Sequence, residues 1–144
     1  MENKIIWPQY TDKMIKNVTD ILKSGKVNQW TGSKVKEFEK KYAEYFGVKF
    51  AVAVTNGSVA LDLCLRAIAL NNGDEVIITP RSFLASASSI TNCGGIPVFV
   101  DIDPITQNIN LENIKKGVSQ KTKAVILVHF AGLPCDCTEI VEWC

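Results

Sequence analysis

The stretch VAVTNGSVALDL, residues 52–63, decides the fold that the sequence predicts. Ala51 to Thr55 are small and apolar and predict a buried strand, and a run of helix-forming residues follows Asn56-Gly57-Ser58. A passage from strand to helix with almost no loop places this turn at the carboxyl end of a strand. An open parallel sheet binds its ligands at that edge, where helix N-termini point at them.

The turn has the chemistry of an anion-binding site. The unpaired amides and partial positive charge of a helix N-terminus suit a phosphate group. Gly57 lets the backbone come close to an anion, the Ser58 hydroxyl adds a donor, and we expect the amides of Ser58 and Val59 to point outwards. A tight turn with Ser58 as the helix N-cap explains the same residues, and both interpretations stay open. The stretch is neither a Walker A loop nor a G-x-G-x-x-G fingerprint.

Strands and helices are expected to alternate from residue 50 onward. Because the predicted strands are apolar at every position, they must be covered on both faces, which indicates a mostly parallel sheet between two layers of helices. Two amphipathic helices precede this part, capped by Thr11 and Ser33 and ended by Gly25 and Gly47. The sequence therefore predicts an N-terminal helical segment, 1–48, and an incomplete three-layer α/β domain, 49–144. The expected strands are 51–55, 75–79, 97–102 and 124–130, and the expected helices after residue 50 are 58–70, 82–92, 111–118 and 137–144.

Composition excludes several classes of protein. Sixteen basic and fifteen acidic residues leave a net charge of +1, and the sequence has no basic cluster for nucleic acid. The apolar runs are too short to cross a bilayer, and no signal peptide is visible. Five cysteines without the spacing of a disulfide framework indicate reduced thiols. We expect a cytoplasmic protein without membrane or nucleic-acid partners.

Three further positions carry alternative interpretations. Phe83 follows the second strand and either stacks on a flat cofactor or belongs to the core. His129 lies near Cys135 and Cys137, but a Cys-x-Cys pair with one histidine lacks the paired spacing of a zinc site, so the sequence predicts no metal. The strand-ending Asp101 and Asp103 could bind a ribose. Without a glycine fingerprint upstream, turn and capping roles are favoured.

Several linked motifs resemble one family, the DegT/DnrJ/EryC1/StrS sugar aminotransferases that depend on pyridoxal phosphate. The opening of the chain, ILKSGKVNQWTGSKVKEFEKKYAEYFGVKFAVAV, resembles the opening of that family. The resemblance covers nearly the whole chain and implies the first part of the large domain of a fold-type I enzyme. The other motifs that carry it, in order, are TNGSVALDLCLRAI, GDEVIITPRSFLASASSI, GGIPVFVDIDPITQNINLENI and KTKAVILVHFAGLPCD.

The resemblance implies roles for residues of the cofactor site. Gly57, Ser58 and Val59 match the turn around the phosphate of pyridoxal 5'-phosphate, with Ser58 in place of the commoner threonine. Phe83 matches the aromatic residue that stacks on the pyridine ring. His129 to Gly132 match an H-x-x-G stretch that shapes the floor of the crevice.

The segment QWTG matches the border of the substrate site, often beside the partner subunit. Trp30, Thr31 and Gly32 are therefore candidate substrate-binding residues, and a plain turn before Ser33 is the alternative.

As a whole, the resemblance implies transfer of an amino group from glutamate or glutamine to a nucleotide-linked keto-sugar, by an enzyme that is a homodimer at full length. Surface polysaccharide, lipopolysaccharide and antibiotic-sugar synthesis are all compatible with it. A sugar dehydratase of the same family and a non-catalytic module that binds a phosphate or cofactor remain alternatives.

The family's lysine that carries the cofactor and the acid beside the pyridine nitrogen have no counterpart in this sequence. We therefore assign no catalytic residue. We expect a truncated chain that is inactive alone and poorly soluble, because it would expose apolar surface.

Overall fold

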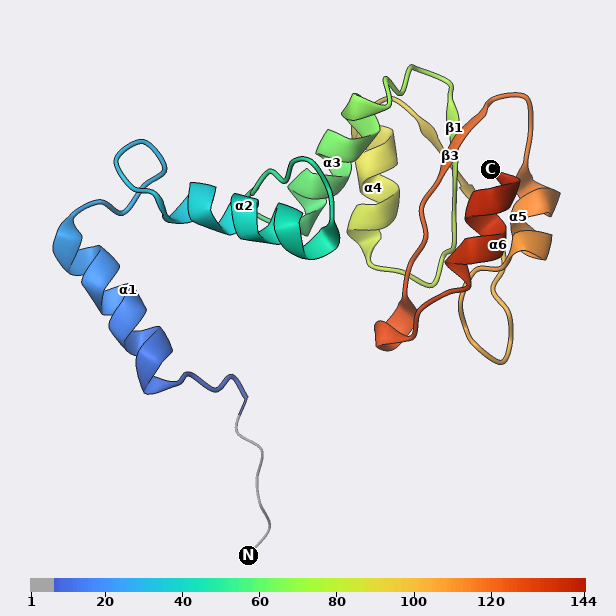
Figure 1. Cartoon of the computed structure of the whole chain (residues 1–144). Coiled ribbons are helices and arrows are strands. Elements are labelled where there is room, and N and C mark those ends of the chain that lie inside the picture. The colour runs from blue at the N-terminus through green and yellow to red at the C-terminus, as the bar shows by residue number, and fades with distance from the viewer. Residues whose placement is uncertain (1–6) are drawn as a thin grey trace, which may run out of the picture. The chain divides into compact units, whose positions relative to one another are not determined.

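The computed structural model describes residues 7–144. These residues fall into two compact units divided between Ala53 and Val54 (Figure 1). We call them the N-terminal unit and the C-terminal unit. The division lies five residues after the predicted boundary at 48/49. No helix in the described part of the chain is long and apolar enough to cross a membrane.

Two helices make up the N-terminal unit, α1 (Asp12–Ser24) and α2 (Lys34–Phe46). The Thr11 hydroxyl accepts a hydrogen bond from the Met14 amide at 3.3 Å, which confirms the predicted cap. Gly25 and Gly47 end the helices with φ of 66° and 65°, where glycine avoids the strain of a side chain. Ser33 precedes α2 but does not cap it, because its hydroxyl bonds to the Glu37 carboxylate instead.

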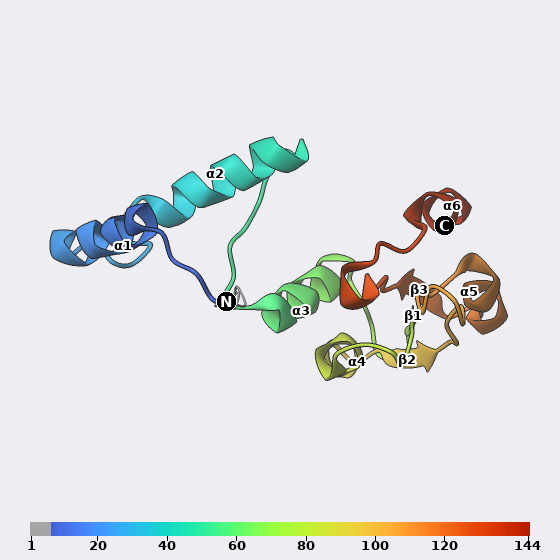
Figure 2. The ribbon, with the colours of Figure 1, turned by 90° about the horizontal axis from the view of Figure 1, so that it is seen from below.

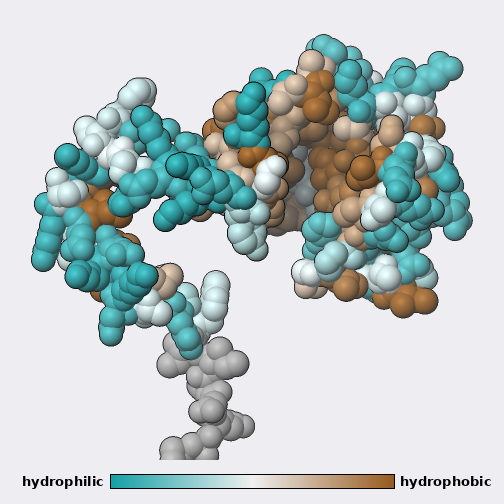
Figure 3. Space-filling model, in the orientation of Figure 1, coloured by the Kyte–Doolittle hydropathy of each residue, from teal (hydrophilic) through white to brown (hydrophobic). Residues whose placement is uncertain are grey.

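The apolar faces of these two helices are exposed, and hydrophobic residues appear among hydrophilic ones on the visible face of the α1 region (Figure 3). Phe38, Tyr42 and Phe46 follow one another along α2, with ring centroids 5.6 and 4.6 Å apart. Ala43 is the one buried residue in α2, and α1 has none. The amphipathic pattern therefore forms as predicted, but these helices contribute little buried core.

The C-terminal unit is built on a three-stranded parallel sheet. Its strands are β1 (Glu75–Ile78), β2 (Ile96–Phe99) and β3 (Thr122–Val125), in the spatial order β2-β1-β3. Helices α3 (Gly57–Ala67) and α4 (Leu84–Asn92) lie on one side of the sheet (Figures 1 and 2). Helices α5 (Leu111–Gly117) and α6 (Cys137–Trp143) lie on the other side. This arrangement confirms the predicted three-layer α/β fold.

Successive side chains of β1 point to opposite layers because a strand has a period of two. Ile77 packs with Leu111, Ile114 and Ile140 from α5 and α6. Val76 and Ile78 pack on the other side with Leu65 of α3 and Ile90 of α4. All three β1 side chains are fully buried. The central strand therefore holds both cores together.

The predicted strand at 51–55 is wrong. Val52 and Val54 are exposed, and the residues from 50 to 54 have no regular structure. An extended segment becomes a strand only when its backbone pairs with a neighbour. The Ala53 amide instead donates to the Glu39 carboxylate at 2.9 Å. The sheet of the described chain consequently has three of the four expected strands.

Helices α3 and α4 run in the same direction along the sheet (Figure 1). Helix α4 begins at the edge where β1 ends, because it follows β1 through the short connection from 79 to 83. Helix α3 runs in the same direction and therefore begins at the same edge (Figure 1). Two helix N-termini are thus placed at the carboxyl edge of the sheet, where parallel α/β folds bind ligands.

Candidate functional site

Asn56 is the N-cap of α3. Its backbone is extended, with φ −163° and ψ 173°, and its side-chain oxygen accepts from the Val59 amide at 3.0 Å. The alternative interpretation with Ser58 as the N-cap is therefore wrong, because the cap lies two residues earlier. We expected the Val59 amide to point outwards, but it donates to the Asn56 side chain and is not a free donor.

The first two residues of α3 keep their donors available. Among the described residues, the amides of Gly57 and Ser58 and the Ser58 hydroxyl form no hydrogen bond. A methyl group added to Gly57 would meet nothing within 4 Å, so this backbone faces open space. The first turn carries no acidic residue. The start of α3 thus fits a phosphate, with two amides, one hydroxyl and the positive end of an 11-residue helix.

Phe83 lies at the start of α4, and its side chain is 77% exposed. This exposure rules out the core interpretation of Phe83 in the described structure. The ring lines a shallow hollow together with Ile78 and Phe99, which end β1 and β2. Gly57, Ser58 and Val59 are not among the residues that line that hollow. The structure thus places Phe83 at the carboxyl ends of the strands.

The connection between β1 and α4 contains a charged residue that sequence reasoning missed. The guanidinium of Arg81 lies over the Phe130 ring, 4.3 Å from its centroid. The Thr79 hydroxyl accepts from the Arg81 amide at 3.2 Å. A cation is thereby held beside the ends of β1 and β3. In the sequence, the position of Arg81 in the Pro-Arg-Ser turn directly after a predicted buried strand indicates a charge at this edge of the sheet.

The buried side chain of Asn108, which precedes α5, hydrogen-bonds to two residues of the segment that follows β3. It donates to the Leu133 carbonyl at 2.9 Å and accepts from the Phe130 amide at 3.0 Å. The 3₁₀ helix η1 (Phe130–Gly132) begins at the first of these contacts along the chain and ends one residue before the second. Asn108 therefore fixes the turn from both ends, a role that no motif in the sequence revealed.

Asp101 and Asp103 have the turn and capping roles that were favoured over ribose binding. Asp103 accepts from the Thr106 amide at 2.7 Å, from the Thr106 hydroxyl at 3.0 Å and from the Ile105 amide at 3.0 Å. These bonds, the Thr106 amide first, lower the pKa of the Asp103 carboxyl. Asp101 accepts from the amide of Ile102 at 2.8 Å.

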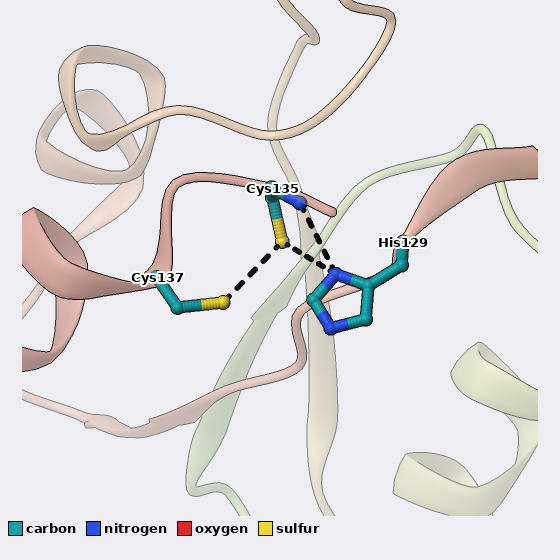
Figure 4. Close-up of side chains that lie close together, drawn as sticks. All are labelled: His129, Cys135 and Cys137. Carbon is teal, nitrogen blue, oxygen red and sulfur yellow. Dashed lines mark hydrogen bonds between the residues drawn. The ribbon is translucent and has the colours of Figure 1, made fainter. Parts of the chain in front are cut away.

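His129, Cys135 and Cys137 come together in the fold (Figure 4). The Cys135 sulfur lies 3.2 Å from His129 Nδ1 and 3.9 Å from the Cys137 sulfur. Burial raises the pKa of the Cys135 thiol, and the hydrogen bond with Cys137 raises it further. Asp136 precedes α6, but its side chain forms no capping hydrogen bond. The sequence placed these three residues near one another, but their spacing did not predict a metal site.

The segment Trp30 to Gly32 belongs to the N-terminal unit, and the Trp30 side chain is 96% exposed. The Asn28 side-chain oxygen accepts from the amides of Trp30 and Thr31 at 2.9 and 3.1 Å. A methyl group at Gly32 would lie 2.6 Å from the Lys26 carbonyl oxygen, so only glycine fits this loop. The segment forms the tight turn that was the alternative interpretation, with the Trp30 ring facing solvent.

The C-terminal unit is a parallel α/β fold in which the start of α3 presents donors without a partner. Residues 8–144 match the DegT/DnrJ/EryC1/StrS aminotransferase family. The chain belongs to this family, as its motifs led us to expect.

Two curated relatives show how much of such proteins the chain covers. The chain is 43% identical over 127 residues to the spore coat polysaccharide biosynthesis protein SpsC of Bacillus subtilis, covering 88% of this chain and 32% of the relative. It is 37% identical over 129 residues to GDP-perosamine synthase of Vibrio cholerae, covering 90% and 35%. The chain thus spans about a third of the length of these relatives.

Solved structures agree with the observed fold. The aminotransferase from Psychrobacter cryohalolentis matches with a TM-score of 0.91 and 44% identity, over 95% of this chain and 35% of that chain. Spr1654 from Streptococcus pneumoniae was solved in PLP- and PMP-forms. Both forms match with a TM-score of 0.86 and 35% identity, over 94% of this chain and 34% of that chain.

Proposed function

We propose that this chain supplies the phosphate-binding part of a pyridoxal-phosphate-dependent aminotransferase acting on a nucleotide-linked keto-sugar, with glutamate or glutamine as the amino donor. The observation that carries the proposal is the start of α3, where Gly57 and Ser58 offer unpaired donors at the carboxyl edge of a parallel sheet. When bound, the cofactor supplies an electron sink for amino transfer.

The residues of this chain would bind and orient the cofactor. The amides of Gly57 and Ser58 and the Ser58 hydroxyl hold the phosphate, and the exposed Phe83 ring stacks on the pyridine ring. Val59 contributes its amide only if the Asn56 side chain releases it. Trp30, Thr31 and Gly32 border the sugar substrate.

The proposal extends to the whole protein. Residues 49–144 belong to the cofactor-binding domain, and 1–48 form a separate helical segment. The active assembly is a cytoplasmic homodimer in a pathway that makes a surface polysaccharide or another glycan. The similarity to the spore coat polysaccharide biosynthesis protein SpsC and to GDP-perosamine synthase supports this choice of pathway.

A comparison of two ligands tests the phosphate site directly. Pyridoxal phosphate and pyridoxal differ only in the phosphate ester, and a 15.9 kDa chain is suited to amide NMR. We expect the Gly57 and Ser58 amide signals to shift on titration with pyridoxal phosphate and to stay in place with pyridoxal. Equal shifts with both ligands, or none with either, would contradict the proposal.

A pair of serine variants makes the test specific. Ser58→Ala removes a proposed phosphate donor, so it should weaken binding of pyridoxal phosphate about tenfold, the equivalent of one charge-assisted hydrogen bond. Ser88→Ala, in α4, removes a hydroxyl that is not part of the site and should leave binding unchanged. A similar loss in both variants would show that the effect is not local.

A further inference from the structure

Three potential metal ligands lie close together between β3 and the start of α6, namely His129, Cys135 and Cys137. His129 follows β3, Cys135 follows η1, and Cys137 is the first residue of α6. Their ligand atoms all lie within 4.8 Å of one another, and the close-up in Figure 4 shows the Cys135 sulfur next to Nδ1 of the imidazole ring and the Cys137 sulfur next to that of Cys135. Neither the proposed cofactor site nor the family resemblance uses these thiols.

Two of the three separations between the ligand atoms are close to the edges of a tetrahedral zinc site, and the third lies within 4.8 Å. Zinc–sulfur bonds of about 2.3 Å and zinc–nitrogen bonds of about 2.05 Å place two sulfurs about 3.8 Å apart and a sulfur and a nitrogen about 3.6 Å apart. The sulfurs of Cys135 and Cys137 are 3.9 Å apart, and Cys135 Sγ is 3.2 Å from His129 Nδ1. A cation could therefore bind with side-chain movements of a few tenths of an ångström at these two edges.

The surrounding structure holds the ligands in place. Asn108 is buried and bonds to the Phe130 amide and the Leu133 carbonyl, at the two ends of the turn between His129 and Cys135. The Leu133 amide also donates to the Phe130 carbonyl at 2.9 Å. Metal sites bind best when neighbouring groups fix the ligands beforehand. The cluster has this support without any metal present.

We propose that His129, Cys135 and Cys137 bind one thiophilic divalent cation, Zn²⁺ in the first place, through Nδ1 and two thiolates. Each thiol releases its proton to solvent on binding, and the two thiolate charges neutralise the cation. The metal takes the place of the hydrogen bond that Nδ1 accepts from the Cys135 amide at 3.1 Å. Water completes the tetrahedron, because the described chain offers three ligands at this place.

Metal titration of the reduced chain tests the proposal. Co²⁺ bound to two thiolates and an imidazole in a tetrahedron gives intense visible absorption, whereas octahedral Co²⁺ is nearly colourless. We expect one equivalent of Co²⁺ to produce the intense spectrum and one equivalent of Zn²⁺ to abolish it. A weak octahedral spectrum, or uptake without a one-to-one end point, would overturn the proposal.

Variants identify the ligands. Loss of a group that only supports a ligand costs 10- to 100-fold in metal affinity, so loss of a ligand should cost at least about 100-fold. Cys137→Ser and His129→Asn should both show this loss. His129 is the only histidine in the sequence, so no other imidazole can replace it. Unchanged affinity in either variant would contradict the proposal.

Two controls separate metal binding from folding and from oxidation. Cys64 is exposed on α3, and Cys64→Ser should bind Co²⁺ like the parent chain. Saturating Zn²⁺ should raise the thermal midpoint of the parent and of Cys64→Ser, and leave that of His129→Asn unchanged. If Cys135 and Cys137 instead form a disulfide that persists under reducing conditions, the metal proposal fails.

Discussion

At the scale of single residues, Asn56 controls how many donors the start of α3 presents. Its side chain satisfies the Val59 amide, which leaves the amides of Gly57 and Ser58 for a ligand. The same side chain stabilises the helix by satisfying a donor that has no partner within the helix. Asn56 therefore affects both the stability of α3 and the number of donors that a ligand can use, and substitutions can separate these two effects.

Two substitutions of Asn56 should separate these effects. Asn56→Ala removes the cap and should lower the free energy of unfolding by about 1 kcal/mol in chemical denaturation. Asn56→Asp keeps a capping oxygen, so stability should stay close to that of the parent. Its negative charge should nevertheless weaken binding of pyridoxal phosphate. Tight binding by Asn56→Asp would argue against a phosphate at this helix start.

Asp103 gives a pH dependence with a definite sign. The Thr106 amide is the main cause of its lowered carboxyl pKa. A carboxyl whose pKa is lower in the folded state adds stability above its unfolded pKa and loses it as the pH falls through its folded pKa. We expect the Ile105 and Thr106 amide signals to move at a pH below the ordinary aspartate range. Asp103→Asn, which cannot titrate, should abolish this movement.

At the scale of elements, β1 is the strand on which both cores depend. Ile77 is 0% exposed and packs against α5 and α6. Ile77→Ala should lower the free energy of unfolding by about 2–5 kcal/mol, because it leaves a cavity in a layer that cannot collapse freely. Ile105 is 89% exposed, and Ile105→Ala should change stability by less than about 0.5 kcal/mol in the same denaturation experiment.

Elements whose signals are local could be predicted from the sequence. Thr11, Gly25 and Gly47 bound their helices as expected, since a cap depends on a few neighbouring residues. Ser33 failed as a cap because Glu37 supplied a competing partner for its hydroxyl. The segment 51–55 failed as a strand because pairing depends on a remote neighbour that its apolar pattern does not reveal.

In the candidate sites, too, features that depend on neighbouring residues could be predicted, and features that depend on the folded structure could not. The Ser58 donors could be predicted because a helix start has the same free groups in any fold, whereas the Gly57 amide was not among the predicted donors. The loss of the Val59 amide to Asn56 depended on one side-chain rotamer. The cluster of His129 with two cysteines depended on the turn at 130–132, where Ala131 has a φ of 51°. No spacing rule for metal sites includes such a turn.

At the scale of the whole molecule, the two units differ in how much core they bury. The N-terminal helices contain one buried residue, Ala43, whereas the C-terminal unit contains two clusters of buried side chains. Local stability follows the amount of buried apolar contact. The units should therefore differ in how readily their backbones open.

Hydrogen exchange followed by mass spectrometry measures this difference. Amides of α1 and α2 should exchange orders of magnitude faster than those of β1, because opening the helices exposes little apolar surface. Peptides from 84–92 serve as a helical control, since α4 packs on the sheet and should exchange slowly. Protection of α1 equal to that of β1 would contradict this expectation.

The middle strand of the sheet is also the first of the three to be synthesised. As the nascent chain leaves the ribosome, Glu75–Ile78 emerges before Ile96–Phe99 and well before Thr122–Val125. Both edges of β1 therefore stay unpaired until the neighbouring strands have been translated. We expect the chain to depend on chaperones during that interval, and slow codons placed before residue 122 to increase its aggregation in the cell.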